Sequence, residues 1–294
     1  MSFTQTVKEE IIKNSPKSEY QIKYELEAFY QQTITFVEEN TVLFKTESKL
    51  VAERFFEDIE LVYGLSLGML FDFEDPFVRS YECEINNEEI FSDALKANSM
   101  DFNPNEMSSE HKKIYVATTF LIIGYILNPE KNYHIEFSFT NGVHANNLID
   151  ILLDFDINLK ETAKKNSLML YIKDSEQISN FLGLVGAYNA LMNMENIKIV
   201  KDVRNSINRS VNCETANLKK TVNASLKQTE AITLIKKMKG LNILPDALYQ
   251  VAEARLNNPD LNLQELADQL GITKSCINHR FRKILEIAEE LRGK

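Results

Sequence analysis

The side chains best suited to chemistry in this sequence lie in one short stretch near its C-terminal end. Ser275, Asn278, His279 and Arg282 are spaced i, i+3, i+4 and i+7, so in a helix they share one strip. Serine, asparagine and arginine can hydrogen-bond to the edges of DNA bases, and lysine and arginine can neutralise phosphates. The candidate DNA-binding residues are therefore Lys274, Ser275, Asn278, His279, Arg280, Arg282 and Lys283, with Arg280 at the margin of the strip.

The alternative is a charged helix face that contacts only solvent. Residues 274–283 contain no Asp or Glu, although the whole chain of 294 residues has a net charge of −10. A local surface without acids in an acidic chain favours contact with a polyanion. We therefore expect this strip to contact double-stranded DNA.

Two predicted helices joined by a tight turn hold the strip. Asn262 is placed to cap the first helix, and Gly271 follows that helix where a left-handed residue is needed. Thr273 can cap the second helix, whose apolar residues face inward. These inward residues are Ile277, Phe281, Ile284, Leu285 and Ala288. A short helix, a turn and a second helix with an apolar stripe are typical of the helix-turn-helix motif.

A further predicted helix supports this motif from its N-terminal side. It starts at Pro245, and its inward face carries Leu248, Val251, Ala252 and the stem of Arg255. We expect residues 241–294 to form an all-α helix-turn-helix domain.

Charge is distributed unevenly along the chain. Residues 1–197 carry 16 basic and 32 acidic residues, a net charge of −16. Residues 198–239 carry 10 basic and 3 acidic residues, a net charge of +7, and residues 240–294 are nearly neutral. A basic segment just before a helix-turn-helix is typical of nucleic-acid binding, and its candidate contacts with the DNA backbone are Arg204, Arg209, Lys219 and Lys220.

Composition excludes several classes of protein. The hydrophobic fraction of 44% argues against disorder, and the length suggests about two domains. Three widely spaced cysteines give neither a disulfide framework nor a metal motif, and the four histidines form no ligand-spaced pair. The start of the chain is an amphipathic helix rather than a signal peptide, and the longest apolar run, residues 116–127, is too short for a bilayer. We expect a cytoplasmic protein without metal, cofactor or small-molecule substrate.

The first two thirds of the chain repeat one order of elements. The first copy is expected to contain helices at 19–32, 48–63 and 87–97, and strands at 33–37, 41–46, 65–72 and 77–85. The stretch 97–110 looks like a linker. The second copy is expected to contain helices at 109–127, 143–155 and 175–182, the last capped by Ser175, and strands at 132–140, 157–161 and 167–174.

Corresponding positions in the two copies lie roughly 90 residues apart. Examples are Leu26 with Leu121, Ser48 with Gly142, Leu65 with Ile157 and Glu88 with Glu176. A unit used twice predicts a pseudo-twofold α+β body, followed by the all-α domain. Two such sheets side by side can form a saddle-shaped surface.

Two long runs make the chain resemble the WhiA family of bacterial regulators. They are KDVRNSINRSVNCETANLKKTVNASLKQ at 201–228 and SCINHRFRKI at 275–284. The resemblance covers nearly the whole chain. It implies a LAGLIDADG-like body, related to homing endonucleases, and a C-terminal helix-turn-helix. The implied domains are a first LAGLIDADG-like repeat at 1–100, a second at 101–197, a basic connector at 198–240 and the helix-turn-helix domain at 241–294.

The motif helices of a LAGLIDADG nuclease each end in an acid that holds Mg²⁺. ELEAFYQQT at 25–33 and FLIIGYILNP at 120–129 stand where these helices are expected, and the residues that match the acids are Thr33 and Asn128. Neither can carry a negative charge. The resemblance therefore implies a nuclease fold that is not an enzyme.

The resemblance implies a transcription regulator of cell division and chromosome segregation, and of sporulation in sporulating relatives, associated with the nucleoid. A second reading is a non-catalytic scaffold of the division machinery whose acidic body docks a partner protein, and a third is a homing-type endonuclease. The run 198–228 is explained equally by phosphate contacts or by a connector whose asparagines cap turns. We expect a monomer, because internal symmetry makes dimerisation unnecessary for a saddle.

Overall fold

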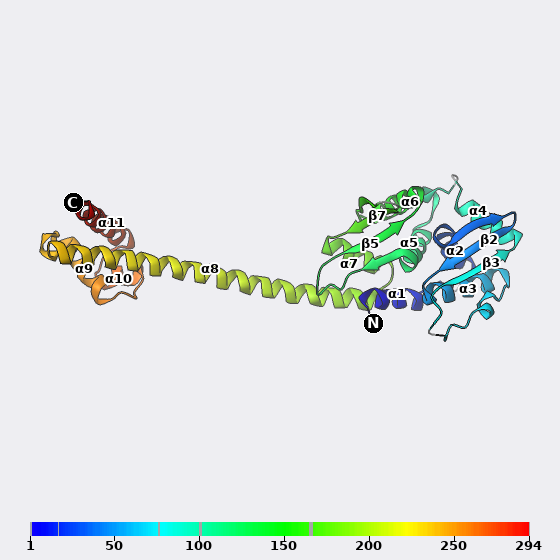
Figure 1. Cartoon of the computed structure of the whole chain (residues 1–294), viewed down its shortest axis with the longest axis horizontal. Helices are drawn as coiled ribbons and strands as arrows, with labels where there is room; N and C mark the ends of the chain where they lie inside the picture. Colours follow the sequence, from blue (N-terminus) through cyan, green and yellow to red (C-terminus); the bar gives the residue numbers. More distant parts are fainter. Residues whose placement is uncertain (1, 17, 76, 100–101, 165–166, 294) are drawn as a thin grey trace. The chain divides into compact units, whose positions relative to one another are not determined.

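The computed structural model describes residues 2–16, 18–75, 77–99, 102–164 and 167–293. The chain divides into two compact units, Met1–Val200 and Lys201–Lys294 (Figure 1). The first unit contains two antiparallel sheets with helices, and the second is all-α. The predicted fold class is confirmed.

The first repeat forms a three-stranded sheet in the order β1-β2-β3. Its elements are α2 (Glu19–Thr33), β1 (Ile34–Glu38), β2 (Thr41–Thr46), α3 (Lys49–Tyr63), β3 (Tyr81–Asn86) and α4 (Glu88–Ala97). Asn40 takes the left-handed conformation, with φ 62°, at the tight turn between β1 and β2. Phe44 and Phe55 stack at 4.2 Å between ring centroids in the core of this repeat.

The strand expected at 65–72 is wrong. This segment forms only the short 3-10 helix η1 (Leu67–Leu70), and the strand expected from residue 77 begins at Tyr81. Phe71 and Phe73 turn back onto Phe56 and Tyr81, with ring centroids 5.2 Å and 5.3 Å apart. These aromatic contacts take the place of strand pairing in the sheet. The segment is an almost continuous apolar run without alternation, so its sequence does not distinguish a strand from a packed loop.

The second repeat forms a four-stranded antiparallel sheet in the order β4-β5-β7-β6. Its elements are α5 (Ser109–Ile123), β4 (Gly124–Ile126), β5 (Ile135–Phe139), α6 (Gly142–Leu153), β6 (Lys160–Lys164), β7 (Ser167–Ile172) and α7 (Ser175–Leu184). The short 3-10 helix η2 (Pro104–Glu106) interrupts the expected linker. The cap of α7 is Asp174, which accepts from the Gln177 amide, and not Ser175.

The helix expected to reach residue 127 ends at Ile123, because the chain turns into β4 at Gly124. A Cβ atom at Gly124 would lie 2.2 Å from the Phe120 ring and 2.6 Å from the Phe120 carbonyl oxygen. Only glycine fits so close a passage. The apolar run continues across this bend because both the helix and the strand are buried. The hydropathy of the sequence therefore does not show where the helix ends.

Helices α2 and α5, one from each repeat, lie side by side at the centre of the first unit (Figure 1). Leu121 of α5 joins the core of the first repeat, and Ala28 of α2 joins the core of the second. The Gln21 side chain donates to Glu110 at 2.7 Å across the same seam. This pair of equivalent helices is the pseudo-twofold feature that the internal repeat predicts. Helix α1 (Phe3–Lys13) packs on α5 and β4 and is capped by Ser2.

The basic run at 198–228 lies inside one continuous helix, α8 (Tyr188–Met238). Its asparagines occupy helical positions, so the expectation that they cap turns is wrong. Residues 202–220 are exposed throughout. No helix within the described ranges is long and apolar enough to cross a membrane.

The C-terminal unit packs the end of α8 against three shorter helices. These are α9 (Asp246–Asn257), α10 (Leu263–Gln269) and α11 (Lys274–Arg292), with the 3-10 helix η3 (Leu241–Ile243) between α8 and α9. Ile232 and Ile235 of α8 are fully buried with Leu266 of α10 and Phe281 of α11. The last two turns of α8 therefore belong to the helix-turn-helix core.

Candidate nucleic-acid interface

The turn between α10 and α11 has the geometry that its residues predict. Asn262 and Glu265 form a reciprocal capping box at the start of α10. Gly271 has φ 62°, in the left-handed region that follows a helix end. The Thr273 hydroxyl accepts from the Cys276 amide at 3.2 Å and caps α11. These caps fix where α11 begins and hence which of its residues face outward.

The strip predicted on α11 is exposed. Ile277, Phe281 and Ile284 are buried in the core of the unit, and six of the seven candidate residues lie on the opposite side. The exposed residues are Lys274, Ser275, Asn278, His279, Arg282 and Lys283. Arg280 is half-buried, and its Nη1 donates to the Ala247 carbonyl oxygen at 3.3 Å, which ties α11 to α9. The structure thus brings the candidate strip onto one surface with Arg280 at its margin.

The cations of this strip have no counter-charge within their own unit. Among the described residues, no carboxylate forms an ion pair with Lys274, Arg282 or Lys283. Acids begin only at Glu286, further along α11. The helix dipole acts within the first and last turns, where Lys274, Glu289 and Glu290 oppose it at a cost of roughly 0.3–1 kcal/mol each and Arg292 favours it. A cation at the start of a helix lowers the stability of the free protein. Such a cost is expected where an external anion binds at that helix start.

Arg255 supports α11 from behind. Its side chain is 1% exposed, and its guanidinium lies over the Phe281 ring at 5.4 Å from the centroid. Nε donates to Gln228 Oε1 at 3.0 Å, and Nη1 donates to the Leu261 carbonyl oxygen at 2.6 Å. Burial lowers the pKa of Arg255 from its ordinary value. One side chain therefore joins α8, the loop before α10 and the core face of α11, whereas the sequence predicted only that its stem would pack inward.

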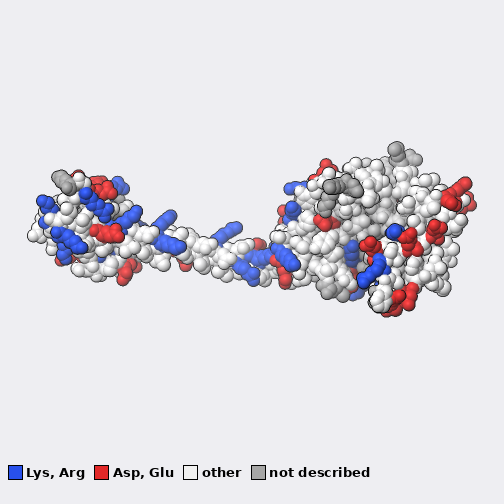
Figure 2. All heavy atoms as spheres, viewed as in Figure 1, with Lys and Arg blue, Asp and Glu red and all other residues white. Residues whose placement is uncertain are grey.

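The candidate backbone contacts on α8 are all exposed, but they do not share one face. Arg209 and Lys220 are 11 residues apart, which is about three helical turns, so they point the same way about 16 Å apart. Lys227 lies about two turns further on the same side. Arg204 and Lys219 point to other sides of the helix. Figure 2 shows lysine and arginine side chains along α8 and over the C-terminal unit.

The structure also locates the ends of the two motif helices. Thr33 ends α2, and its hydroxyl donates to the Phe29 carbonyl oxygen at 2.7 Å. Asn128 lies beyond the end of α5, so its placement at that helix end is wrong and the corresponding residue is Ile123. Neither Thr33 nor Ile123 has a carboxylate. Within the described ranges, no group of three or more His, Cys, Asp or Glu side chains could hold a metal ion.

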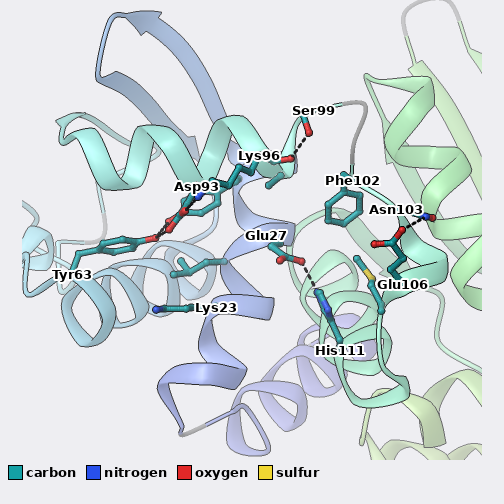
Figure 3. A pocket seen from close by; sticks show the side chains of 14 residues that line it. Lys23, Glu27, Tyr63, Asp93, Lys96, Ser99, Phe102, Asn103, Glu106 and His111 are labelled. Atoms are coloured by element: carbon teal, nitrogen blue, oxygen red, sulfur yellow. Dashed lines mark hydrogen bonds and ion pairs between the residues drawn. The ribbon is translucent and has the colours of Figure 1, made fainter.

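The first unit contains a cavity of about 450 Å³ beside α2 (Figure 3). Four of the charged side chains that line it contact a neighbour within the cavity. His111 lies 2.5 Å from Glu27, and Asp93 accepts from both Tyr63 and Lys96. Side chains already paired in this way offer no free group that would select a ligand.

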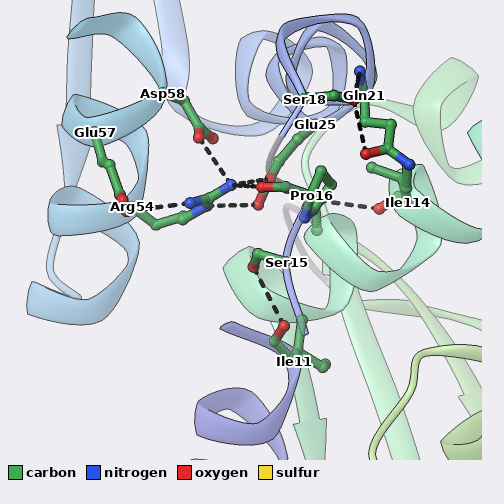
Figure 4. Close-up of polar contacts among 11 residues, drawn as sticks. Ile11, Ser15, Pro16, Ser18, Gln21, Glu25, Arg54, Glu57, Asp58 and Ile114 are labelled. Atoms are coloured by element: carbon green, nitrogen blue, oxygen red, sulfur yellow. Dashed lines mark hydrogen bonds and ion pairs between the residues drawn. The ribbon is translucent and has the colours of Figure 1, made fainter. Parts of the chain in front are cut away.

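A buried ion network connects α2 and α3 in the same unit (Figure 4). Arg54 donates to both carboxylate oxygens of Glu25, at 3.1 Å and 2.7 Å, and its Nη2 lies 2.9 Å from Asp58. Burial and, to a smaller extent, the negative charge of Glu25 raise the pKa of Asp58 to about 9. One arginine balances one buried carboxylate, so Glu25 carries the charge and Asp58 is neutral near pH 7.

The fold and the interface together define a helix-turn-helix protein with a LAGLIDADG-like body. The WhiA LAGLIDADG-like domain matches residues 112–204, and the WhiA C-terminal HTH domain matches residues 207–288. "Probable cell division protein WhiA" of Clostridium tetani is 38% identical over 99% of this chain and 98% of its own length. This chain belongs to the WhiA family.

Solved structures agree with this assignment. Full-length DUF199/WhiA from Thermatoga maritima is 27% identical, with a TM-score of 0.60 over 99% of both chains. The N-terminal LAGLIDADG domain of DUF199/WhiA is 20% identical and has the same fold, with a TM-score of 0.50. The match covers 63% of this chain and 90% of that domain. The protein of the same name in Clostridium acetobutylicum is 50% identical over 62% of this chain and 58% of its own length.

Proposed function

We propose that this protein binds double-stranded DNA in a sequence-specific manner through the exposed strip of α11. The observation that carries the proposal is the acid-free set of cations and hydrogen-bonding side chains on the second helix of a helix-turn-helix. Asn278 and Arg282 suit base edges in the major groove, and Lys274 and Lys283 suit phosphates. Arg209 and Lys220 of α8 are the pair best placed to add contacts with one DNA backbone, because they share a face.

The biological role that we propose is transcription regulation of cell division and chromosome segregation, in association with the nucleoid. The relatives that match this chain over most of its length are called probable cell division proteins. Within this proposal, the four segments 1–100, 101–197, 198–240 and 241–294 serve as two LAGLIDADG-like repeats, a basic helical connector and the DNA reader. Residues 231–240 also contribute to the core of the reader.

A second candidate function, a non-catalytic scaffold, is favoured by the charge of the body. The net charge of −16 over residues 1–197 opposes contact with phosphates and suits a partner protein with a basic surface. The two functions are compatible, since the reader and the body are separate units. Nuclease activity ranks below both, because Thr33 and Ile123 supply no carboxylate for Mg²⁺.

Fluorescence anisotropy on DNA duplexes across a salt series tests the DNA-binding proposal. Replacing Lys274, Arg282 and Lys283 by alanine in the full chain should reduce affinity at least 100-fold and reduce the salt slope by about 2, because Lys274 and Lys283 are the proposed phosphate contacts. The matched control replaces Lys236, Lys237 and Lys239, which are also exposed cations of this unit. Equal losses in the two variants would show that net charge, and not the strip, binds DNA.

A further inference from the structure

The middle of α8 carries an apolar stripe that the C-terminal unit does not cover. It consists of Val203, Ile207, Val211, Leu218, Val222 and Leu226, which are between 47% and 65% exposed. Steps of four and seven residues return to nearly the same side of a helix, so the six side chains share one face. Exposed apolar side chains in a row, rather than scattered singly, indicate an interface.

Little within this segment holds it helical. Five asparagines, weak helix formers, occur between residues 205 and 223. None of the residues from 202 to 227, all of which the structure describes, forms an ion pair. A long helix with weak propensity and no internal ion pairs gains most of its stability from packing of its apolar face. The stripe is therefore expected to be covered in the working protein.

The spacing of the stripe points to what covers it. Along the chain the six residues are separated by 4, 4, 7, 4 and 4 positions, so the pattern is the same in both directions. In two antiparallel copies related by a twofold axis between residues 214 and 215, Val203 faces Leu226 of the second copy. Ile207 then faces Val222, and Val211 faces Leu218. Each of the six positions meets another of the six, which is the self-complementarity that a twofold interface requires. Ile199, four residues before Val203 and 60% exposed, lies outside this match and would face Glu230.

Charge is compatible with the same arrangement. Arg209, Lys220 and Lys227 lie on the side of α8 opposite the stripe, so they point outward from an antiparallel pair. Arg204 points the same way as Val222, 18 residues further on, and would lie opposite Ser225 of the second copy. The like charges that meet near the axis are the two copies of Glu214. Thr221 and Ser225 also point toward the seam, so the seam is apolar at its six paired positions, and Arg209, Lys220 and Lys227 remain free for DNA.

We propose that this protein forms a homodimer through antiparallel pairing of the α8 stripe, residues 203–226, with the same stripe of a second copy. This differs from the monomer expected from internal symmetry. That symmetry makes a saddle possible within one chain, but it leaves the α8 stripe uncovered. The proposal does not depend on DNA binding, because it rests on the apolar face alone.

Sedimentation velocity of the full chain without DNA, over a range of micromolar concentrations, tests the stoichiometry. The full chain should sediment as a dimer at the upper end, and the double variant Ile207→Asn/Leu218→Asn as a monomer. The matched control, Ser206→Asn/Ala216→Asn, places the same residue type on exposed positions of other faces and should remain a dimer. Far-UV circular dichroism checks that all variants stay folded. A monomeric full chain, or the same oligomeric state in both variants, would overturn the proposal.

Cysteine cross-linking tests the orientation. The variants Ile207→Cys and Val222→Cys are made separately with Cys213→Ser and Cys276→Ser, since the remaining Cys83 is buried. Mixing the two variants under mild oxidation should give a cross-linked dimer, and Ile207→Cys alone should give at least tenfold less. Efficient cross-linking of Ile207→Cys to itself would indicate a parallel pair and would overturn the antiparallel arrangement.

Discussion

At the scale of residues, the proposed DNA contacts of the α11 strip are of two kinds, with base edges and with phosphates. Asn278 lies near the middle of the strip, where an amide can form two hydrogen bonds with adenine. Lys283 lies further along, where an ammonium group can neutralise a phosphate whatever the sequence. Both side chains are exposed, so replacing either should change binding without disturbing the core.

Asn278→Ala should cost about 1–3 kcal/mol at a preferred site and relax specificity, because a base contact is lost. Lys283→Ala should weaken binding to all duplexes alike and reduce the salt slope by about 1, because one phosphate contact is lost. Anisotropy titrations with preferred and random duplexes at several salt concentrations measure both. Equal effects of the two substitutions on both duplexes would remove the claim that this helix reads bases.

The neutral Asp58 beside Arg54 makes the stability of the body depend on pH. In the folded protein burial raises the pKa of Asp58 to about 9, above its unfolded value of 3.8. A group with a raised folded pKa contributes stability that is fully present below pH 3.8 and is lost as the pH rises toward 9. Asparagine keeps the shape of the neutral acid and cannot ionise.

Asp58→Asn should therefore flatten the pH dependence of unfolding between pH 4 and 9 and stabilise the protein at pH 8 by up to about 5 kcal/mol. Thermal unfolding followed across this pH range measures the effect. Glu57→Gln is the control, since Glu57 contacts the same arginine but its side chain is 62% exposed. An unchanged pH slope in Asp58→Asn would mean that Asp58 is ionised in the folded state.

At the scale of elements, Arg255 joins α8 to the helix-turn-helix. Arg255→Met keeps the aliphatic stem but leaves the Gln228 side chain and the carbonyls of Asn258 and Leu261 without this donor. We expect α10 and α11 to be destabilised by about 2–4 kcal/mol. Faster amide exchange in these helices, with α2 and α5 unchanged, is the readout. Arg292→Met, at an exposed position, should change exchange little, and a similar change in both variants would contradict this role.

At the scale of the whole molecule, the two units have opposite electrostatic characters. The body is acidic, and the basic run begins where the C-terminal unit begins. A chain ending at Val200 should bind duplex DNA at least tenfold more weakly than the full chain, because phosphate neutralisation supplies most non-specific affinity. A cut at residue 240 is less suitable, since it would uncover Ile232 and Ile235. Binding by the shorter chain equal to that of the full chain would make the body the DNA-binding part.

The sequence predicted correctly the helices that begin with a capping side chain or end at a left-handed glycine. Asn262, Gly271 and Thr273 determine the helix-turn-helix because a cap or a left-handed residue acts within a few positions of the chain. The internal repeat likewise predicted two α+β units. The exposed strip on α11 could be predicted for the same reason, since helical spacing alone separates it from the buried face.

The tertiary structure decided what depends on contacts between distant segments. Gly124 ends α5 because the chain passes against Phe120, and residues 65–72 leave the sheet because their aromatic side chains pack on Phe56 and Tyr81. The structure also shows that residues 201–228 continue one helix, so that an apolar stripe with palindromic spacing is exposed on it. Caps and periodicity are properties of neighbouring residues, and the sequence alone determines them. Burial, helix ends within apolar runs and uncovered faces depend on packing partners, and only the folded chain decides those.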